Sequence, residues 1–216
     1  MDSYMSGFLE EFGEPENTRF PDKTYIENYR DKLPDALLSY WAELGFCRFM
    51  GGLFWIVDPE DYVGILDSWI EGSPLKKLNE NFYVIARSGY GDLYIWAEKS
   101  GCCYEINAAN GRIFKPDNPE DNAELELQLF FGAKSPDTID IEDEDTDEEM
   151  FELAVNLHGP LEEDEMFAFE PSLVLGGGRL TNNLHKVNLY VHLDIILQLQ
   201  PPQVIGIDDL ADMAFS

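Results

Sequence analysis

The feature that most constrains the fold is a succession of short strand-like segments between residues 82 and 115, separated by turn signals. Gly89-Tyr90-Gly91 separates the first two segments, and Asn110-Gly111 separates the last two. Asn-Gly favours a hairpin turn because both residues tolerate positive φ. The sequence therefore predicts an antiparallel meander. Its four strands are expected at residues 82–86, 92–97, 102–106 and 112–115.

Helices are predicted on both sides of this meander. Leu37, Trp41 and Leu44 repeat at helical spacing, and prolines suit the first position of a helix. A further hairpin is expected earlier in the chain, because Gly51-Gly52 separates two apolar segments. The expected class is α+β, with a helix-flanked antiparallel sheet. The helices are expected over residues 3–13, from Pro34 to Gly45, after Asp58-Pro59, and from Pro119 to Gly132.

The segment 135–149 is expected to be an acidic linker between a first domain, 1–134, and a second, 150–216. Thr146 precedes three acidic residues in a pattern that fits a capping box, so a helix is predicted from Asp147 to about residue 157. The rest of the second domain is expected to be a smaller helical and extended subdomain. Its extended segments are predicted at 166–169 and 173–175, a turn at 176–178, and a buried helix over 187–199.

The charge of the chain restricts the kind of partner it can bind. The formal net charge is −29, and eight of the ten residues from Asp140 to Glu149 are acidic. The hydrophobic content of 44% is nevertheless enough for a folded core, which separates this chain from acidic disordered proteins. A negative field repels phosphate and attracts cationic surfaces. We therefore expect a basic protein as the partner, rather than a nucleic acid.

Partner contacts are expected where carboxylates are densest along the chain. Runs of charge also occur as solvated surfaces that bind nothing, and this alternative stays open. The candidates are Asp140, Glu142, Asp143, Glu144 and Asp145 in one patch, and Glu162, Glu163 and Asp164 in a second.

The sequence does not match the motifs of known metal, cofactor or catalytic sites. Asp143, Asp145 and Asp147 have the first three spacings of an EF-hand loop, but the glycine and glutamate required later in that loop are missing. Residues 176–179, Gly-Gly-Gly-Arg, lack the phosphate-loop pattern. No catalytic residue, metal site or cofactor is therefore predicted. A hydrolase with an unrecognised carboxylate pair remains a rival hypothesis.

The sequence also bears on the compartment. No apolar run approaches the roughly 20 residues needed to span a bilayer, and the N-terminus has no basic region followed by an apolar stretch. Cys47, Cys102 and Cys103 make a poor disulfide framework, so we expect free thiols in a reducing cytosol. The chain is expected to be cytoplasmic and not to interact with membranes.

An ordered set of motifs resembles a known pair of domains. The first part of the chain resembles the bacterial GAD-like domain. The motifs that carry this resemblance are Leu33-Pro34, Tyr40-Trp41, Gly45-Phe46, Gly51-Gly52-Leu53-Phe54-Trp55, Asp58-Pro59-Glu60-Asp61-Tyr62, Ala86-Arg87 and Tyr90-Gly91-Asp92-Leu93. The domain that commonly follows it in type VI secretion immunity proteins of the Tdi type is resembled by 157–161, 164–171, 173–177, Lys186-Val187 and His192-Leu193.

This resemblance implies an immunity protein that binds and silences a cognate toxin, often a DNA-degrading nuclease, and it supplies no catalytic residues. It agrees with the charge, because a nuclease needs a cationic cleft to hold phosphates and an acidic protein can occupy that cleft. We therefore expect inhibition by occlusion rather than by chemistry. The alternative is an acidic, non-enzymatic adaptor that binds another basic protein.

Overall fold

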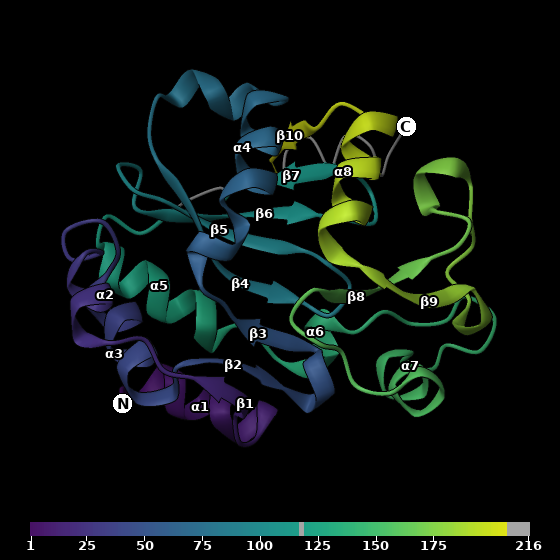
Figure 1. The fold of residues 1–216 in the computed structure, drawn as a ribbon, viewed down its shortest axis with the longest axis horizontal. Coiled ribbons are helices and arrows are strands. Elements are labelled where there is room, and N and C mark those ends of the chain that lie inside the picture. Colours follow the sequence, from purple (N-terminus) through teal and green to yellow (C-terminus); the bar gives the residue numbers. More distant parts are fainter. Residues whose placement is uncertain (117–118, 207–216) are drawn as a thin grey trace.

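The computed structural model describes residues 1–116 and 119–206, and an eight-stranded sheet forms its centre (Figure 1). Neighbouring strands are antiparallel except at one edge, where β10 pairs in parallel with β7. The predicted hairpin and meander are confirmed. In sheet order the strands are β1 (Glu16–Arg19), β2 (Phe46–Phe49), β3 (Phe54–Ile56), β4 (Phe82–Ser88), β5 (Leu93–Ala97), β6 (Cys102–Asn107), β7 (Arg112–Phe114) and β10 (Gln203–Ile205).

Helices pack around this sheet, and the predicted α+β class is confirmed. α4 and α8 pack against each other in front of the sheet as it is seen in Figure 1, while α1 and α3 pack against α5. The α-helices are α1 (Ser3–Phe12), α2 (Lys23–Glu27), α3 (Asp35–Leu44), α4 (Val63–Glu71), α5 (Ala123–Gly132), α6 (Pro136–Ile139), α7 (Phe151–His158) and α8 (Leu189–Leu199). Short 3₁₀ turns are η1 (Met50–Gly52), η2 (Pro59–Tyr62), η3 (Pro74–Leu78), η4 (Leu173–Leu175) and η5 (Thr181–Asn183).

One aromatic cluster joins the first helices to the sheet. The ring of Phe8, on α1, lies against Phe49 of β2, Phe54 of β3 and Phe131 of α5, with ring centroids between 5.1 and 5.8 Å apart. Such edge-on contacts add to the free energy gained by burying the rings. Helices α1 and α5, more than a hundred residues apart in the chain, are thereby fixed to one face of the sheet.

The C-terminal part of the chain adds a separate two-stranded sheet, made of β8 (Glu165–Phe169) and β9 (Leu184–Asn188). The extended segment predicted at 166–169 is confirmed, but 173–175 forms the 3₁₀ turn η4 instead. The helix predicted from residue 187 begins at Leu189. The side chain of Asn188 accepts a hydrogen bond from the backbone N–H of Val191 and so caps the helix two residues later than expected.

The helix predicted from Asp147 to about residue 157 is present as α7, but it begins at Phe151, so the predicted start and its capping box are wrong. Asp147 has a φ of 56°, in the left-handed region, which interrupts the expected first turn. The carboxylate of Asp140 accepts a hydrogen bond from the backbone N–H of Phe151, at 3.1 Å. A residue far outside the predicted capping box therefore caps α7. α5 likewise begins later than predicted, at Ala123, where Asn122 is the cap.

The strands β1 and β10, at the two edges of the large sheet, were not predicted. β10 follows Pro201-Pro202 and pairs with β7, so a segment after α8 completes a sheet that begins near the N-terminus. The division at residues 135–149 into two domains stays a prediction. Across residues 1–116 and 119–206, no helix has the length and apolar character to cross a membrane.

Candidate functional site

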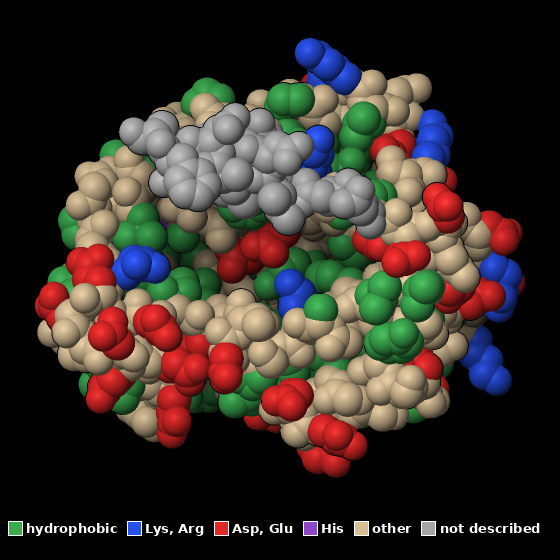
Figure 2. All heavy atoms as spheres, turned by 180° about the vertical axis from the view of Figure 1, so that it is seen from behind, with side chains coloured by type: hydrophobic (Ala, Val, Ile, Leu, Met, Phe, Trp, Pro, Cys, Tyr) green, Lys and Arg blue, Asp and Glu red, His purple; other side chains and the backbone are tan. Residues whose placement is uncertain are grey.

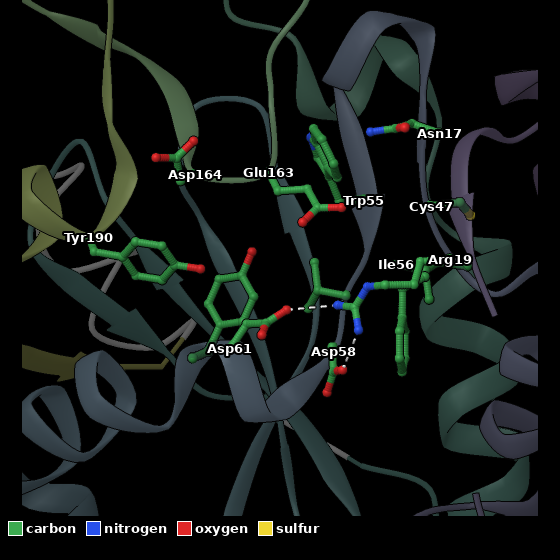
Figure 3. A pocket seen from close by; sticks show the side chains of 13 residues that line it. Asn17, Arg19, Cys47, Trp55, Ile56, Asp58, Asp61, Glu163, Asp164 and Tyr190 are labelled. Atoms are coloured by element: carbon green, nitrogen blue, oxygen red, sulfur yellow. Dashed lines mark hydrogen bonds and ion pairs between the residues drawn. The ribbon is translucent and has the colours of Figure 1, made fainter. Parts of the chain in front are cut away.

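A cavity of about 340 Å³ lies where the large sheet meets the loop before β8 and the start of α8 (Figure 3). Its floor is formed by β2 and β3, and its walls come from β1, η2, the loop before β8 and the start of α8. We call it the acidic pocket. Its polar side chains include Arg19, Asp58, Asp61, Glu163, Asp164 and Tyr190.

The floor of the acidic pocket depends on the register of three strands. Trp55 pairs with Arg48 on β2 and with Arg87 on β4, and residues directly opposite one another point to the same face of a sheet. The guanidinium carbon of Arg87 lies 4.1 Å from the centre of the Trp55 ring, and that of Arg48 lies 6.0 Å away. Two arginines therefore flank one tryptophan beneath the pocket.

These arginines also hold the loop that carries the second acidic patch. Arg87 is fully buried and donates to the backbone carbonyls of Glu162 and Glu163, both at 3.3 Å. Arg48 donates to the carbonyl of Leu161. Burial lowers the pKa of Arg87. Because backbone carbonyls accept these bonds, the loop is fixed while its carboxylates remain exposed.

Carboxylates outnumber cations in the pocket. Arg19 forms ion pairs with Asp58, at 3.0 Å, and with Asp61, at 2.9 Å, as Figure 3 shows. Partial burial, together with the nearby charge of Asp58, raises the pKa of Asp61 despite this pairing. In the part of the chain that the structure describes, Glu163 and Asp164 form no ion pair. The pocket therefore retains an excess of negative charge.

The first predicted patch is divided between structural and exposed residues. Asp140 is half-buried and accepts from the hydroxyl of Tyr90 as well as from the backbone of Phe151. Asp143 is buried and accepts from the backbone N–H and the hydroxyl of Thr181, at 2.7 and 2.8 Å. These hydrogen bonds lower the pKa of Asp143 to about 2. The exposed members are Glu142, Glu144 and Asp145.

The second predicted patch lies at the rim of the acidic pocket. Glu162, Glu163 and Asp164 are all exposed, and the last two line the cavity. The sequence analysis did not select Asp58 and Asp61, which lie opposite them. Asp58 also caps η2, by accepting from the N–H of Glu60 at 3.1 Å. The sequence analysis used Asp58-Pro59 only to locate the start of a helix.

Burial also affects the chemistry of the cysteine thiols. Burial raises the pKa of the Cys47 thiol to about 12 and that of Cys102 to about 11, which disfavours the thiolate needed by a nucleophile. Over residues 1–116 and 119–206, no group of three or more His, Cys, Asp or Glu side chains is placed to hold a metal ion. The three cysteines are free thiols.

Two protein-family models match the regions of the chain that form this pocket. The model of the GAD-like domain matches residues 3–110. The chain belongs to the GAD-like family. A second model, described as the C-terminal part of the T6SS immunity protein Tdi1, matches residues 124–200. Both resemblances noted in the sequence are thereby confirmed, and the acidic pocket of this GAD-like protein lies between the two matched regions. An immunity-protein family implies a toxin as the partner.

The fold has a counterpart among solved structures. The crystal structure of Atu4351 from Agrobacterium tumefaciens superimposes with a TM-score of 0.78 at 21% sequence identity, covering 93% of this chain and 91% of that one. This likeness extends over both matched regions and shows a shared fold. No curated protein matches the chain.

Proposed function

We propose that this GAD-like protein neutralises a DNA-degrading toxin in the cytoplasm by covering the toxin's cationic cleft. The match of residues 124–200 to a T6SS immunity domain, directly after a GAD-like domain, carries the proposal. An inhibitor of this kind needs a complementary surface rather than catalytic groups. The charge of −29 supports a basic partner, since a nuclease that grips DNA must itself be cationic.

The surface offers acidic side chains on more than one side. Glu142, Glu144 and Asp145 are exposed in one patch, and the loop at 162–164 carries the other. The reverse face also displays many acidic side chains (Figure 2). Focused fields of this kind raise association rates about 10- to 1,000-fold at low salt. We therefore expect the rate of binding to the toxin to fall steeply as ionic strength rises.

The proposal is tested by searching the genes beside this one for a toxin and expressing that toxin in a bacterial host, with and without the GAD-like protein. We expect the toxin alone to stop growth and to degrade plasmid DNA, and co-expression to restore both growth and intact plasmid. A toxin variant that lacks nuclease activity serves as the control for general toxicity. Loss of growth despite co-expression would refute neutralisation. Binding of the toxin without protection would favour the adaptor hypothesis instead.

A further inference from the structure

Helix α8 carries an apolar ridge on its exposed face. Val191, Ile195 and Leu199 are 60%, 46% and 46% exposed, and they recur every four residues. Residues at this spacing lie on one side of a helix. The opposite side of α8 packs into the core through Leu189, Leu193 and Ile196. The helix thus has two apolar sides, and within residues 1–116 and 119–206 only one of them is covered by other segments.

The ridge begins at a groove that adjoins the acidic pocket. A groove of about 430 Å³ between α4 and α8 is lined by Gly64, Tyr190, Val191 and Asp194, among others. Asp61 and Tyr190 line both this groove and the acidic pocket. The pocket, the groove and the first residue of the ridge are therefore continuous on the surface.

The pocket already binds one guanidinium group from its own chain. Arg19 lies between Asp58 and Asp61, with its guanidinium carbon 5.1 Å from the centre of the Phe46 ring. Carboxylates on one side and an aromatic ring on the other are the surroundings that suit arginine. On the opposite wall, Glu163 and Asp164 offer further carboxylates. The cavity thus has the chemistry to receive a second cation.

We propose that the α8 ridge and the acidic pocket form one docking surface for the toxin. In this arrangement an arginine side chain of the toxin enters the pocket beside Glu163 and Asp164, and an apolar patch next to that arginine covers Val191 and Ile195. This inference rests on the proposed function and specifies the surface that performs it. Apolar contacts around a buried cation exclude water, which strengthens the ion pair and slows dissociation.

The ridge is tested with the double variant Val191→Gln/Ile195→Gln, which keeps charge and helix propensity nearly constant. Leu153→Gln/Leu157→Gln is the matched control, because these exposed leucines have the same spacing on α7. The toxin encoded beside the gene is the probe, and thermal unfolding checks that both variants fold. We expect Kd to rise at least tenfold for the α8 pair and to change less than twofold for the α7 pair. Equal Kd values for the α8 variant and the unaltered protein would show that the ridge does not contact the toxin.

The two proposals fail differently in this experiment. If the unaltered protein protects cells and binds the toxin, but the α8 variant binds equally well, the docking surface is wrong and the immunity function stands. If the unaltered protein neither binds the toxin nor protects cells, the proposed function fails, and the docking surface fails with it.

The pocket is tested without any toxin, by NMR titration with the amide of N-acetylarginine. The indole N–H of Trp55, in the pocket floor, is the reporter, and the amide of N-acetylcitrulline is the neutral control. We expect a saturable shift with the arginine compound that is lost in Glu163→Gln/Asp164→Asn. The same shift is expected in Glu10→Gln/Glu11→Gln, which removes two exposed carboxylates from α1. Identical responses to the arginine and citrulline compounds would refute the proposal that the pocket binds a cation.

Discussion

Replacing Asp140 with alanine separates a structural role from a binding role in the acidic segment. The Asp140 carboxylate accepts from the hydroxyl of Tyr90, from the N–H of Ile141 at 2.7 Å, and from the N–H of Phe151 at 3.1 Å. The last of these bonds caps α7, and the first joins the segment to the turn between β4 and β5. Asp140→Ala therefore removes a helix cap and a link between distant segments together.

The expected loss of stability is about 2–4 kcal/mol. Loss of a helix cap costs roughly 1 kcal/mol. The hydroxyl of Tyr90, a residue that is only 2% exposed, is left without its carboxylate partner, at a further cost of about 1–3 kcal/mol. Asp145→Ala is the matched control in the same segment. Its side chain is exposed, so we expect a change within about 0.5 kcal/mol.

Urea unfolding measures the interaction between Asp140 and Tyr90 directly. The four proteins compared are the unaltered chain, Asp140→Ala, Tyr90→Phe and the double variant. We expect a coupling free energy of about 1–2 kcal/mol between the two sites, within the range for directly contacting residues. Tyr90→Phe should cost little once Asp140 is absent. The reasoning is refuted if Asp140→Ala is as stable as Asp145→Ala, or if the two substitutions are additive.

Two further predictions concern the same region. Asp143→Ala is expected to lower the unfolding temperature at neutral pH. Because hydrogen bonding holds the folded pKa near 2, below the unfolded value of 3.8, the difference from the unaltered protein should shrink as pH falls from 4 through 2, where the carboxylate becomes protonated; a difference as large at pH 2 as at neutral pH would contradict this. Gly89→Ala is expected to cost about 1–3 kcal/mol in urea unfolding, since a Cβ there would lie 2.2 Å from the Phe151 ring and 2.6 Å from the Gly52 carbonyl. Gly64→Ala, whose Cβ meets nothing within 4 Å, should be neutral or stabilising, and equal losses at the two sites would refute the packing argument.

The strands from β2 to β7 were predictable because local signals define them. Asn110-Gly111 and the turn at 89–91 lie between apolar segments, and each strand pairs with its neighbour in sequence. β10 lacks such a signal. It has three residues, follows two prolines, and pairs with a strand about ninety residues earlier in the chain. Only the completed sheet edge gives it hydrogen-bond partners.

The role of each residue in the acidic segment was harder to predict, because composition does not show which carboxylates form tertiary hydrogen bonds. Asp143 looks like its neighbours in the sequence, yet its partner is Thr181, 38 residues later. The acidic pocket was only half predicted, since the second patch was identified from its charge while the opposite wall was not. Arg19 and Asp61 come from segments separated by two strands and several helices, and the fold alone brings them to Glu163.

The most direct test of the account is competition between this protein and DNA for the toxin. A fluorescently labelled duplex is bound to a nuclease-inactive variant of the toxin encoded beside the gene, and the GAD-like protein is added while anisotropy is recorded. Occlusion of a cationic cleft predicts that the anisotropy falls to the value of free DNA at a one-to-one ratio of inhibitor to toxin. Anisotropy that stays constant, or that rises because all three molecules assemble together, would contradict the account.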